Sequence, residues 1–148
     1  MSGSRPQLRN VDRLLDRYGK FHRNPANKAI HWVCVPLIVW SVLGMLWAAS
    51  PIAAYVAIGA ATVFYLWLSL PLALGILGVI ALMAWPLALL GAHALWVSIA
   101  VFIAAWIGQF VGHILEGRKP AFLDDVRSLL IGPAWLLAAL YRRLGVAY

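Results

Sequence analysis

Two histidines, His22 and His31, stand on either side of a predicted helix start. The pair Asn24-Pro25 between them is typical of a helix N-terminus, because asparagine caps free backbone N–H groups and proline suits the first helical turn. Within the predicted helix, Asn27 and His31 are four residues apart and therefore share one face. Imidazole is a common metal ligand, but at a membrane surface it also pairs with lipid headgroups and backbone carbonyls. The spacing therefore allows either a metal site or an interfacial role.

A second polar group, formed by Gln109, His113 and Glu116, lies near the other end of the chain. At ~3.6 residues per turn, these side chains fall within about 60° of one another on a helix. Polar side chains at membrane depth are costly and usually turn toward the interior of a bundle. Three imidazoles with one carboxylate and no thiolate favour a divalent transition metal such as non-haem Fe(II), Zn or Mn. We place Glu116 among the metal ligands and also, with Asn27 and Gln109, among the catalytic groups.

The charged residues are confined to 5–28 and 116–143, so the 87 residues of 29–115 carry no charge. Of the 148 residues, 64% are hydrophobic and 11% are charged. An ordinary soluble domain has ~45–50% and ~25%. A bilayer core is crossed by about 20 helical residues, so the uncharged block has room for four crossings. This composition excludes a soluble enzyme and a disordered tail protein.

Cysteine and charge content narrow the class of protein further. Cys34 is the only cysteine, which excludes an internal disulfide, a secreted disulfide scaffold and a cysteine-based zinc site. The formal net charge is +7, and the basic residues flank hydrophobic segments. Attraction to anionic lipid headgroups explains this excess better than binding to nucleic acid does. We therefore expect the lipid bilayer as a partner, and no nucleic acid.

We predict an all-α membrane protein with four transmembrane helices, an N-terminal amphipathic helix and a C-terminal re-entrant or interfacial helix. The spans are expected at 30–49, 51–69, 71–90 and 94–113. The N-terminal helix is predicted from apolar residues at three- and four-residue steps, namely Leu8, Val11, Leu15 and Tyr18. Its apolar stripe should face the lipid headgroups. The C-terminal helix corresponds to the apolar run 126–141, which is short for a crossing.

These elements are expected to form a single domain. It comprises a cytoplasmic amphipathic segment at 1–24, a four-helix transmembrane bundle at 25–113, and a cytoplasmic loop and helix at 114–148. All basic residues lie near the two chain ends, so the positive-inside rule places both termini in the cytoplasm. The two polar groups should then meet at one membrane face, with His93 about one bilayer thickness away. Such spans fit a bacterial inner membrane or, in a eukaryote, the endoplasmic reticulum.

Two motifs resemble those of the yeast-type 2-hydroxy fatty acid dioxygenase family. Residues 106–122, WIGQFVGHILEGRKPAF, resemble the family signature W-x-x-Q-F-x-G-H-x-x-x-E-G-R-x-P-A, with one residue fewer between His and Glu. The family also has an opening motif of a Tyr, two His and an Asn before a proline-containing span. It is similar to six residues here: Tyr18, His22, Asn24, Asn27, His31 and Pro36. The motifs lie near opposite chain ends, so the resemblance covers nearly the whole chain.

The resemblance implies an Fe(II)-dependent dioxygenase that performs α-oxidation, converting a 2-hydroxy fatty acid and O2 into the acid one carbon shorter. His22, His31 and His113 would then bind the iron, and Glu116 occupies the position of the motif glutamate. Family members often have a glutamate a few residues after the proline of the final helix. The residues after Pro133 are instead apolar, AWLLAA, so the chain departs from the family pattern there.

Three basic residues beside the expected site, Arg23, Arg118 and Lys119, could attract the substrate carboxylate, although such residues are common at a cytoplasmic boundary.

Two other functions remain open from the residues alone. Histidines on facing helices also hold haem in electron-transfer bundles. A four-pass bundle could instead bind or transport lipid without catalysis. Transporter sites usually have polar residues near the bilayer midplane, however, where these spans have only scattered Ser and Thr.

Overall fold

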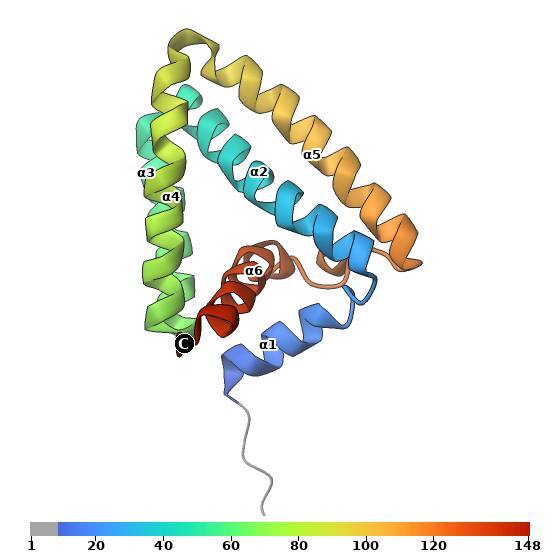
Figure 1. Cartoon of the computed structure of the whole chain (residues 1–148). Helices are drawn as coiled ribbons and strands as arrows, with labels where there is room; N and C mark the ends of the chain where they lie inside the picture. Colours follow the sequence, from blue (N-terminus) through green and yellow to red (C-terminus); the bar gives the residue numbers. More distant parts are fainter. Residues whose placement is uncertain (1–8) are drawn as a thin grey trace, which may run out of the picture.

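The structure, a computed structural model, describes residues 9–148, and within these residues the only regular elements are helices (Figure 1). The α-helices are α1 (Asn10–Gly19), α2 (Pro25–Ala49), α3 (Pro51–Leu68), α4 (Leu70–Leu90), α5 (Ala94–Glu116) and α6 (Ser128–Leu144). There are also two short 3-10 turns: η1 (Gly91–His93) joins α4 to α5, and η2 (Ala121–Leu123) precedes α6. Leu8, the first residue of the predicted apolar stripe, lies outside the described residues.

Helix boundaries follow the capping residues of the sequence. The side chain of Asn24 accepts a hydrogen bond of 2.8 Å from Ala26 N, and Pro25 occupies the first turn of α2, which confirms the predicted start. The side chain of Ser50 similarly caps α3 by accepting a bond from Ala53 N. At the far end of α5, Gly117 adopts a left-handed conformation with φ of 69°, which glycine tolerates without steric cost.

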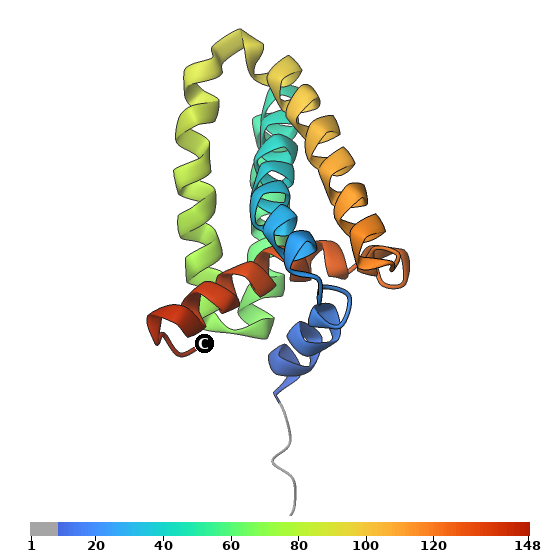
Figure 2. The same ribbon diagram turned by 45° about the vertical axis from the view of Figure 1, so that its right-hand side comes forward.

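The long helices form two pairs that converge at the end opposite the described N-terminus (Figures 1 and 2). One pair is α2 and α5, and the other is α3 and α4. Three helical segments are long and apolar enough to cross a membrane: Pro25–Ala49, Pro51–Leu68 and Leu70–Glu116. The last segment contains both α4 and α5, which run in opposite directions on either side of η1 (Figure 1). Large apolar side chains on the outer faces of the long helices, such as Ile52 of α3 and Leu82 of α4, are exposed, as lipid contact would require.

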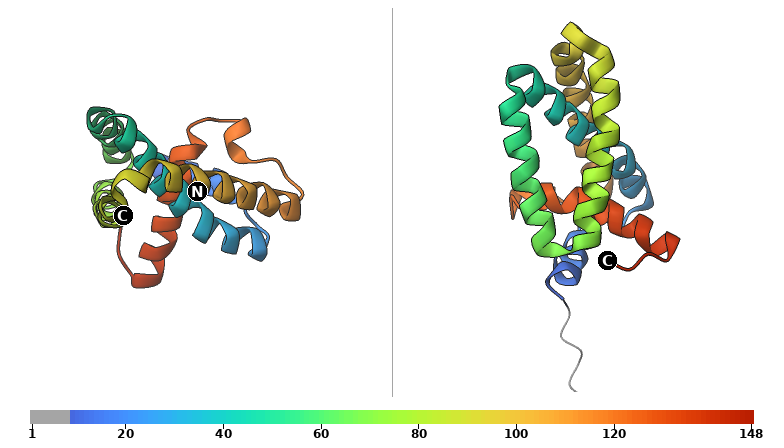
Figure 3. Two further views of the ribbon diagram at one scale, coloured as in Figure 1. Left: turned by 90° about the horizontal axis from the view of Figure 1, so that it is seen from above. Right: turned by 90° about the vertical axis from the view of Figure 1, so that its left-hand side faces the viewer.

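Helix α6 lies across the ends of the long helices (Figure 2 and the right view of Figure 3). Hydrogen bonds from two tyrosines hold α6 in this position. The hydroxyl of Tyr65 donates a hydrogen bond of 2.8 Å to Leu130 O, and the hydroxyl of Tyr141 donates one of 2.9 Å to Pro71 O. Both acceptors are backbone carbonyls in the first turn of a helix, α6 for Leu130 and α4 for Pro71. The helix is thereby held against the lower ends of α3 and α4.

The apolar stripe of α1 packs against α6 instead of facing lipid. Val11 and Leu15 are 2% and 3% exposed, and they belong to the same buried cluster as Ile131 and Leu137 of α6. The prediction that this stripe lies on lipid headgroups was therefore wrong. The physical reason is that α6 presents an apolar face of its own, and the two amphipathic helices bury each other's stripes.

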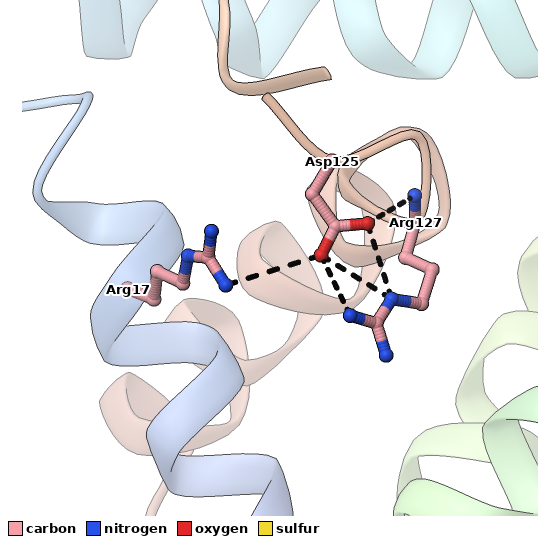
Figure 4. Close-up of polar contacts among 3 residues, drawn as sticks. All are labelled: Arg17, Asp125 and Arg127. Atoms are coloured by element: carbon pink, nitrogen blue, oxygen red, sulfur yellow. Dashed lines mark hydrogen bonds and ion pairs between the residues drawn. The ribbon is translucent and has the colours of Figure 1, made fainter. Parts of the chain in front are cut away.

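Ion pairs at the surface set the path of the connection between α5 and α6 (Figure 4). The carboxylate of Asp125 accepts hydrogen bonds from the backbone and guanidinium of Arg127, and it lies 4.0 Å from the guanidinium of Arg17 on α1. The hydrogen bonds from Arg127 lower the pKa of the Asp125 carboxyl group. Exposed pairs of this kind contribute little to stability, so they position the connection more than they strengthen the fold.

Candidate metal centre

Three histidines from separate parts of the chain meet in the interior. His22 comes from the link between α1 and α2, His31 from α2 and His113 from α5. Their exposed fractions are only 1%, 2% and 6%. One ring nitrogen of each lies within 4.8 Å of the others. The prediction that residues at the two ends of the uncharged block become neighbours is confirmed for these three side chains.

Hydrogen bonds to backbone carbonyls determine which ring nitrogens of His22 and His31 are free. Nδ1 of His22 lies 2.9 Å from Tyr18 O, and Nδ1 of His31 lies 2.9 Å from Asn27 O. A carbonyl oxygen can only accept, so both Nδ1 atoms carry the proton and both Nε2 atoms present a lone pair. Each imidazole therefore offers Nε2 as a ligand, with its ring held by the bond at Nδ1.

The two Nε2 atoms face each other at 2.8 Å. Two lone pairs at this separation repel unless a positive charge lies close to both. Burial lowers the pKa of the His22 imidazole to about 4, which disfavours a shared proton at neutral pH. The separation is less than twice a metal–nitrogen bond of ~2.0–2.1 Å, so a single metal ion can satisfy both atoms. The buried donor set therefore fits a metal cation.

Aromatic rings cover the side of His22 that faces α1 and α6. The ring of Tyr18 stacks on the His22 imidazole with centroids 4.3 Å apart and an interplanar angle of 18°. The ring of Trp135 lies 5.4 Å from His22 and 5.6 Å from Tyr18. The position of Trp135 beside His22 depends on how α6 crosses the bundle. Together these rings exclude water from the buried histidines.

Glu116 joins the end of α5 to the start of α2. Its carboxylate accepts hydrogen bonds of 2.8 Å from the backbone N–H groups of Arg23 and Asn24, and one of 3.1 Å from Nδ2 of Asn27. A carboxylate at a helix N-terminus is also favoured by the helix dipole. Glu116 lies outside the group of potential ligand atoms formed by the three histidines. Its place among the metal ligands stays a prediction. Its hydrogen bonds connect the end of α5 to the start of α2.

The two predicted amide residues lie on either side of the histidines. Asn27 is fully buried, and its Oδ1 has no hydrogen-bond partner within residues 9–148. Gln109 is 6% exposed and borders a cavity together with His31 and His113. Catalytic roles for both residues stay predictions. Both side chains face the region where the sequence analysis expected them.

The three basic residues expected near a substrate carboxylate lie on the surface. The Arg23 side chain is exposed, the Arg118 guanidinium donates a hydrogen bond of 3.4 Å to Lys20 O, and Lys119 pairs with Asp124 at 2.5 Å. None of the three borders the cavity next to the histidines. Their substrate-binding role stays a prediction. His93 is exposed in η1, at the far end of the helix pairs (Figure 1).

A narrow cavity of about 60 Å³ adjoins His31 and His113. It extends between α2, α5, the connection between α5 and α6, and the start of α6; Phe122 of η2 and Leu129 of α6 form part of its wall. Gly132 lies beside it, and a Cβ atom at this glycine would stand 3.0 Å from the Tyr18 hydroxyl. The wall residues of α6 carried no signal in the sequence, because their contact with α2 depends on the crossing of two helices.

Comparison with known proteins gives a family and a relative. Residues 8–144 match the family model described as 2-hydroxy-palmitic acid dioxygenase Mpo1-like. The chain is 32% identical over 139 residues to the 2-hydroxy-palmitic acid dioxygenase MPO1 of Saccharomyces cerevisiae, covering 86% of this chain and 78% of the relative. No solved structure matches. The match over nearly the whole chain, including both histidine-bearing ends, shows that this protein belongs to the Mpo1-like family.

Proposed function

We propose that this protein is an Fe(II)-dependent dioxygenase that uses O2 to convert a 2-hydroxy fatty acid into the acid one carbon shorter. The observation that carries the proposal is the buried trio of His22, His31 and His113, with two Nε2 lone pairs 2.8 Å apart. The name of the yeast relative supplies the reaction type and the substrate class. Imidazole ligands without thiolate are compatible with non-haem iron.

The protein's part in the reaction is to hold and shield the reacting groups. A ferrous ion bound by the three imidazoles would supply Lewis acidity and a path for the electrons that O2 takes from the 2-hydroxy acid. The carbonyls of Tyr18 and Asn27 keep Nε2 of His22 and His31 pointing toward the centre. Gln109 stands at the cavity wall beside His31 and His113, where its amide can hydrogen-bond the polar end of a substrate.

The location of the site suits a substrate that resides in a membrane. We propose that α2, α3, α4 and α5 each cross the bilayer, with the chain as a single domain and both ends in the cytoplasm. The reversal of the chain at η1 within the apolar segment Leu70–Glu116 supports four crossings. The centre then lies at the cytoplasmic end of the bundle, where a carboxylate stays near water while its alkyl chain stays in lipid.

The arrangement of the histidines disfavours the haem alternative. Two axial imidazoles of a haem stand on opposite faces of the porphyrin plane, whereas Nε2 of His22 and Nε2 of His31 are only 2.8 Å apart. This separation leaves no room for a porphyrin between them, since each axial bond alone is about 2 Å, as for other metal–imidazole bonds.

The proposal is tested on the purified full chain in lipid nanodiscs. We expect about one iron per chain, O2 consumption upon addition of a long-chain 2-hydroxy acid, and a product one carbon shorter by mass spectrometry. Removing the metal with a chelator should abolish the activity, and Fe(II) should restore it. The simple fatty acid without the 2-hydroxyl group is the matched control and should consume no O2. Full activity of metal-free protein, or none after iron loading, would overturn the proposal.

A further inference from the structure

The cavity beside the histidines has a polar end and an apolar end. At the polar end stand His31, His113 and Gln109. The indole of Trp106 also borders the cavity, and its buried Nε1–H group has no hydrogen-bond partner within residues 9–148. A buried donor without a partner costs free energy unless a ligand accepts from it. The cavity therefore offers an unused donor and an amide to an incoming carboxylate or hydroxyl group.

Most of the remaining cavity wall is apolar, and one side of it follows α2 away from the histidines. Val35, Ile38 and Val39 of α2 line it on one side, and Leu129 lines it on the other. Val39 is eight positions beyond His31, which corresponds to roughly 12 Å along the helix axis at ~1.5 Å per residue. An alkyl chain whose head lies at the polar end can therefore extend along α2 between apolar side chains.

The cavity is too small for a long alkyl chain. About 60 Å³ admits roughly four to six groups of the size of a water molecule or a methylene, since one such group needs ~10–15 Å³ by the same measure. A palmitic-acid chain has many more carbons than that. The remainder of such a chain must leave through the open side of the cavity.

The open side is apolar, and its α2 border lies well inside the uncharged segment 29–115. Leu129 on its border is 47% exposed, and the side chains of Ile38 and Val39 are partly exposed. Val39 lies eleven positions beyond Lys28, the last charged residue before the uncharged block, or roughly 16 Å further along α2. An apolar opening at this depth of a spanning helix faces hydrocarbon and not water.

We propose that the substrate enters this cavity sideways from the bilayer, and that the protein encloses only its polar end and first few carbons. The remaining alkyl chain then stays in the lipid while the polar end reaches the histidines. The proposal rests on the proposed function for the identity of the substrate, a single-chain 2-hydroxy acid. It adds where the alkyl chain of the substrate lies, which residues contact that alkyl chain, and from which side the substrate enters.

The first test is photo-crosslinking with two 2-hydroxy fatty acids that carry a diazirine at different carbons. The full chain is loaded with iron in nanodiscs and kept without O2, so that binding is read without turnover. A probe with the diazirine at carbon 4 should label 35–39 or 128–133, whereas one with it near the methyl end should label lipid. Labelling of the cytoplasmic surface alone by the carbon-4 probe would overturn the proposal, as would labelling of 35–39 by the methyl-end probe.

The second test narrows the cavity from two sides. Val39→Phe and Leu129→Phe should each lower kcat/KM for a 16-carbon 2-hydroxy acid at least tenfold and reduce carbon-4 labelling, with iron content unchanged. Val33→Phe is the matched control, because Val33 lies on the same helix, is 60% exposed and does not border the cavity. It should change kcat/KM less than twofold. Unchanged kinetics and labelling in both cavity variants would overturn the proposal.

The two tests separate this proposal from the proposed function. A protein without dioxygenase activity that still shows the labelling pattern would retain the cavity assignment and lose the reaction. An active, iron-dependent enzyme with labelling outside the cavity would retain the reaction and lose the cavity assignment. Folding of each variant is checked by its circular-dichroism spectrum and by its elution volume in detergent, and a variant that fails this check is replaced by the other one.

Discussion

His22 and His31 each use one ring nitrogen to hold the imidazole and leave the other ring nitrogen free, so that it could bind a metal ion. The holding partners are carbonyls four residues earlier in the chain, Tyr18 O and Asn27 O, at 2.9 Å in both cases. His113 differs, because its buried Nδ1 has no hydrogen-bond partner in the part of the chain that the structure describes. Its ring is therefore held by packing, with its centroid 5.2 Å from those of His22 and His31.

Replacing one of the three histidines should release the metal. His113→Ala removes one of three nitrogen donors, and we expect at least a tenfold loss of bound iron at limiting metal, since loss of even an outer hydrogen-bond partner costs about 10–100-fold in affinity. Metal content is measured by mass spectrometry of the purified protein. His93→Ala, an exposed histidine at η1, should keep its iron. Equal iron content in the two variants would contradict the three-histidine centre.

Glu116→Gln distinguishes a positioning role from a metal-ligand role. Glutamine keeps the size of the side chain but loses the charge that accepts bonds from the N–H groups of Arg23 and Asn24. We expect a loss of about 1–3 kcal/mol in the free energy of unfolding, as for hydrogen bonds to a charged group. Chemical unfolding in detergent measures this loss, and Asp124→Asn on the exposed connection serves as control. Loss of iron as complete as in His113→Ala would show that Glu116 is itself a ligand.

The pair of helices α2 and α5 forms the wall that brings the histidines together, and small residues allow their close approach. A Cβ atom at Gly108 of α5 would stand 2.6 Å from Cys34 Sγ of α2, and one at Gly112 would collide with Asn27 Oδ1. Small residues at such crossings are typical of helix packing within membranes. The single cysteine is thus explained by packing between two helices.

Gly108→Ala should push α5 away from α2. Overpacking of this kind lowers the free energy of unfolding by about 1–3 kcal/mol. The shift of α5 should also weaken iron binding, because His113 is part of α5 and moves with it. The free energy of unfolding and the iron content are both measured for each variant. The double variant Gly108→Ala with Cys34→Ala should recover most of the loss, since the colliding sulfur is gone. Gly78→Ala on α4, where a Cβ meets no atom within 4 Å, should not destabilise the protein. Equal destabilisation by both alanine variants would contradict this account.

Helix α6 is held across the bundle by hydrogen bonds from the neighbouring helices. Tyr65→Phe removes the hydroxyl that donates to Leu130 O and should lower the free energy of unfolding by about 1 kcal/mol. Faster amide hydrogen exchange within 128–134 is the expected signature. Tyr55→Phe provides the comparison, because the Tyr55 ring is 64% exposed on the outer face of α3. Unchanged exchange in Tyr65→Phe would show that apolar packing alone holds α6.

On the scale of the whole molecule, the chain separates an apolar bundle from a polar base. The base contains α1, α6 and the connection between α5 and α6, and it carries most of the charged residues of the described chain (Figures 1 and 3). Lys28 and Glu116 lie in the long helices, at the ends that meet the base. The histidines lie where base and bundle meet. This placement lets one site contact both a charged head and an alkyl chain, which is the requirement for an enzyme that acts on a fatty acid.

The proposed topology predicts which positions are accessible from each side of the membrane. In a Cys34→Ala background, Ala92→Cys in η1 should react with a membrane-impermeant maleimide from outside the cell. Lys20→Cys and Gly145→Cys should react only after the cytoplasmic face is opened. Labelling of cells and of inverted vesicles measures this. Opposite accessibility of Lys20→Cys and Gly145→Cys would contradict an even number of crossings.

Local patterns along the chain determined most of the helices. The uncharged block 29–115 predicted long apolar helices, because charges are expelled from hydrocarbon, and Asn24-Pro25 predicted the start of α2, because capping depends on neighbouring residues alone. The gathering of the three histidines could also be predicted. It requires only that the two ends of the block lie at one membrane face.

The tertiary structure alone decided which surfaces meet. The stripe of Val11 and Leu15 was visible in the sequence, but periodicity shows that a face is apolar without showing whether lipid or protein covers it. The contacts of Glu116 with the start of α2, and of Trp135 with His22, depend on helix rotation and crossing. Residues so distant in the chain are related only through packing, so no local spacing could reveal them.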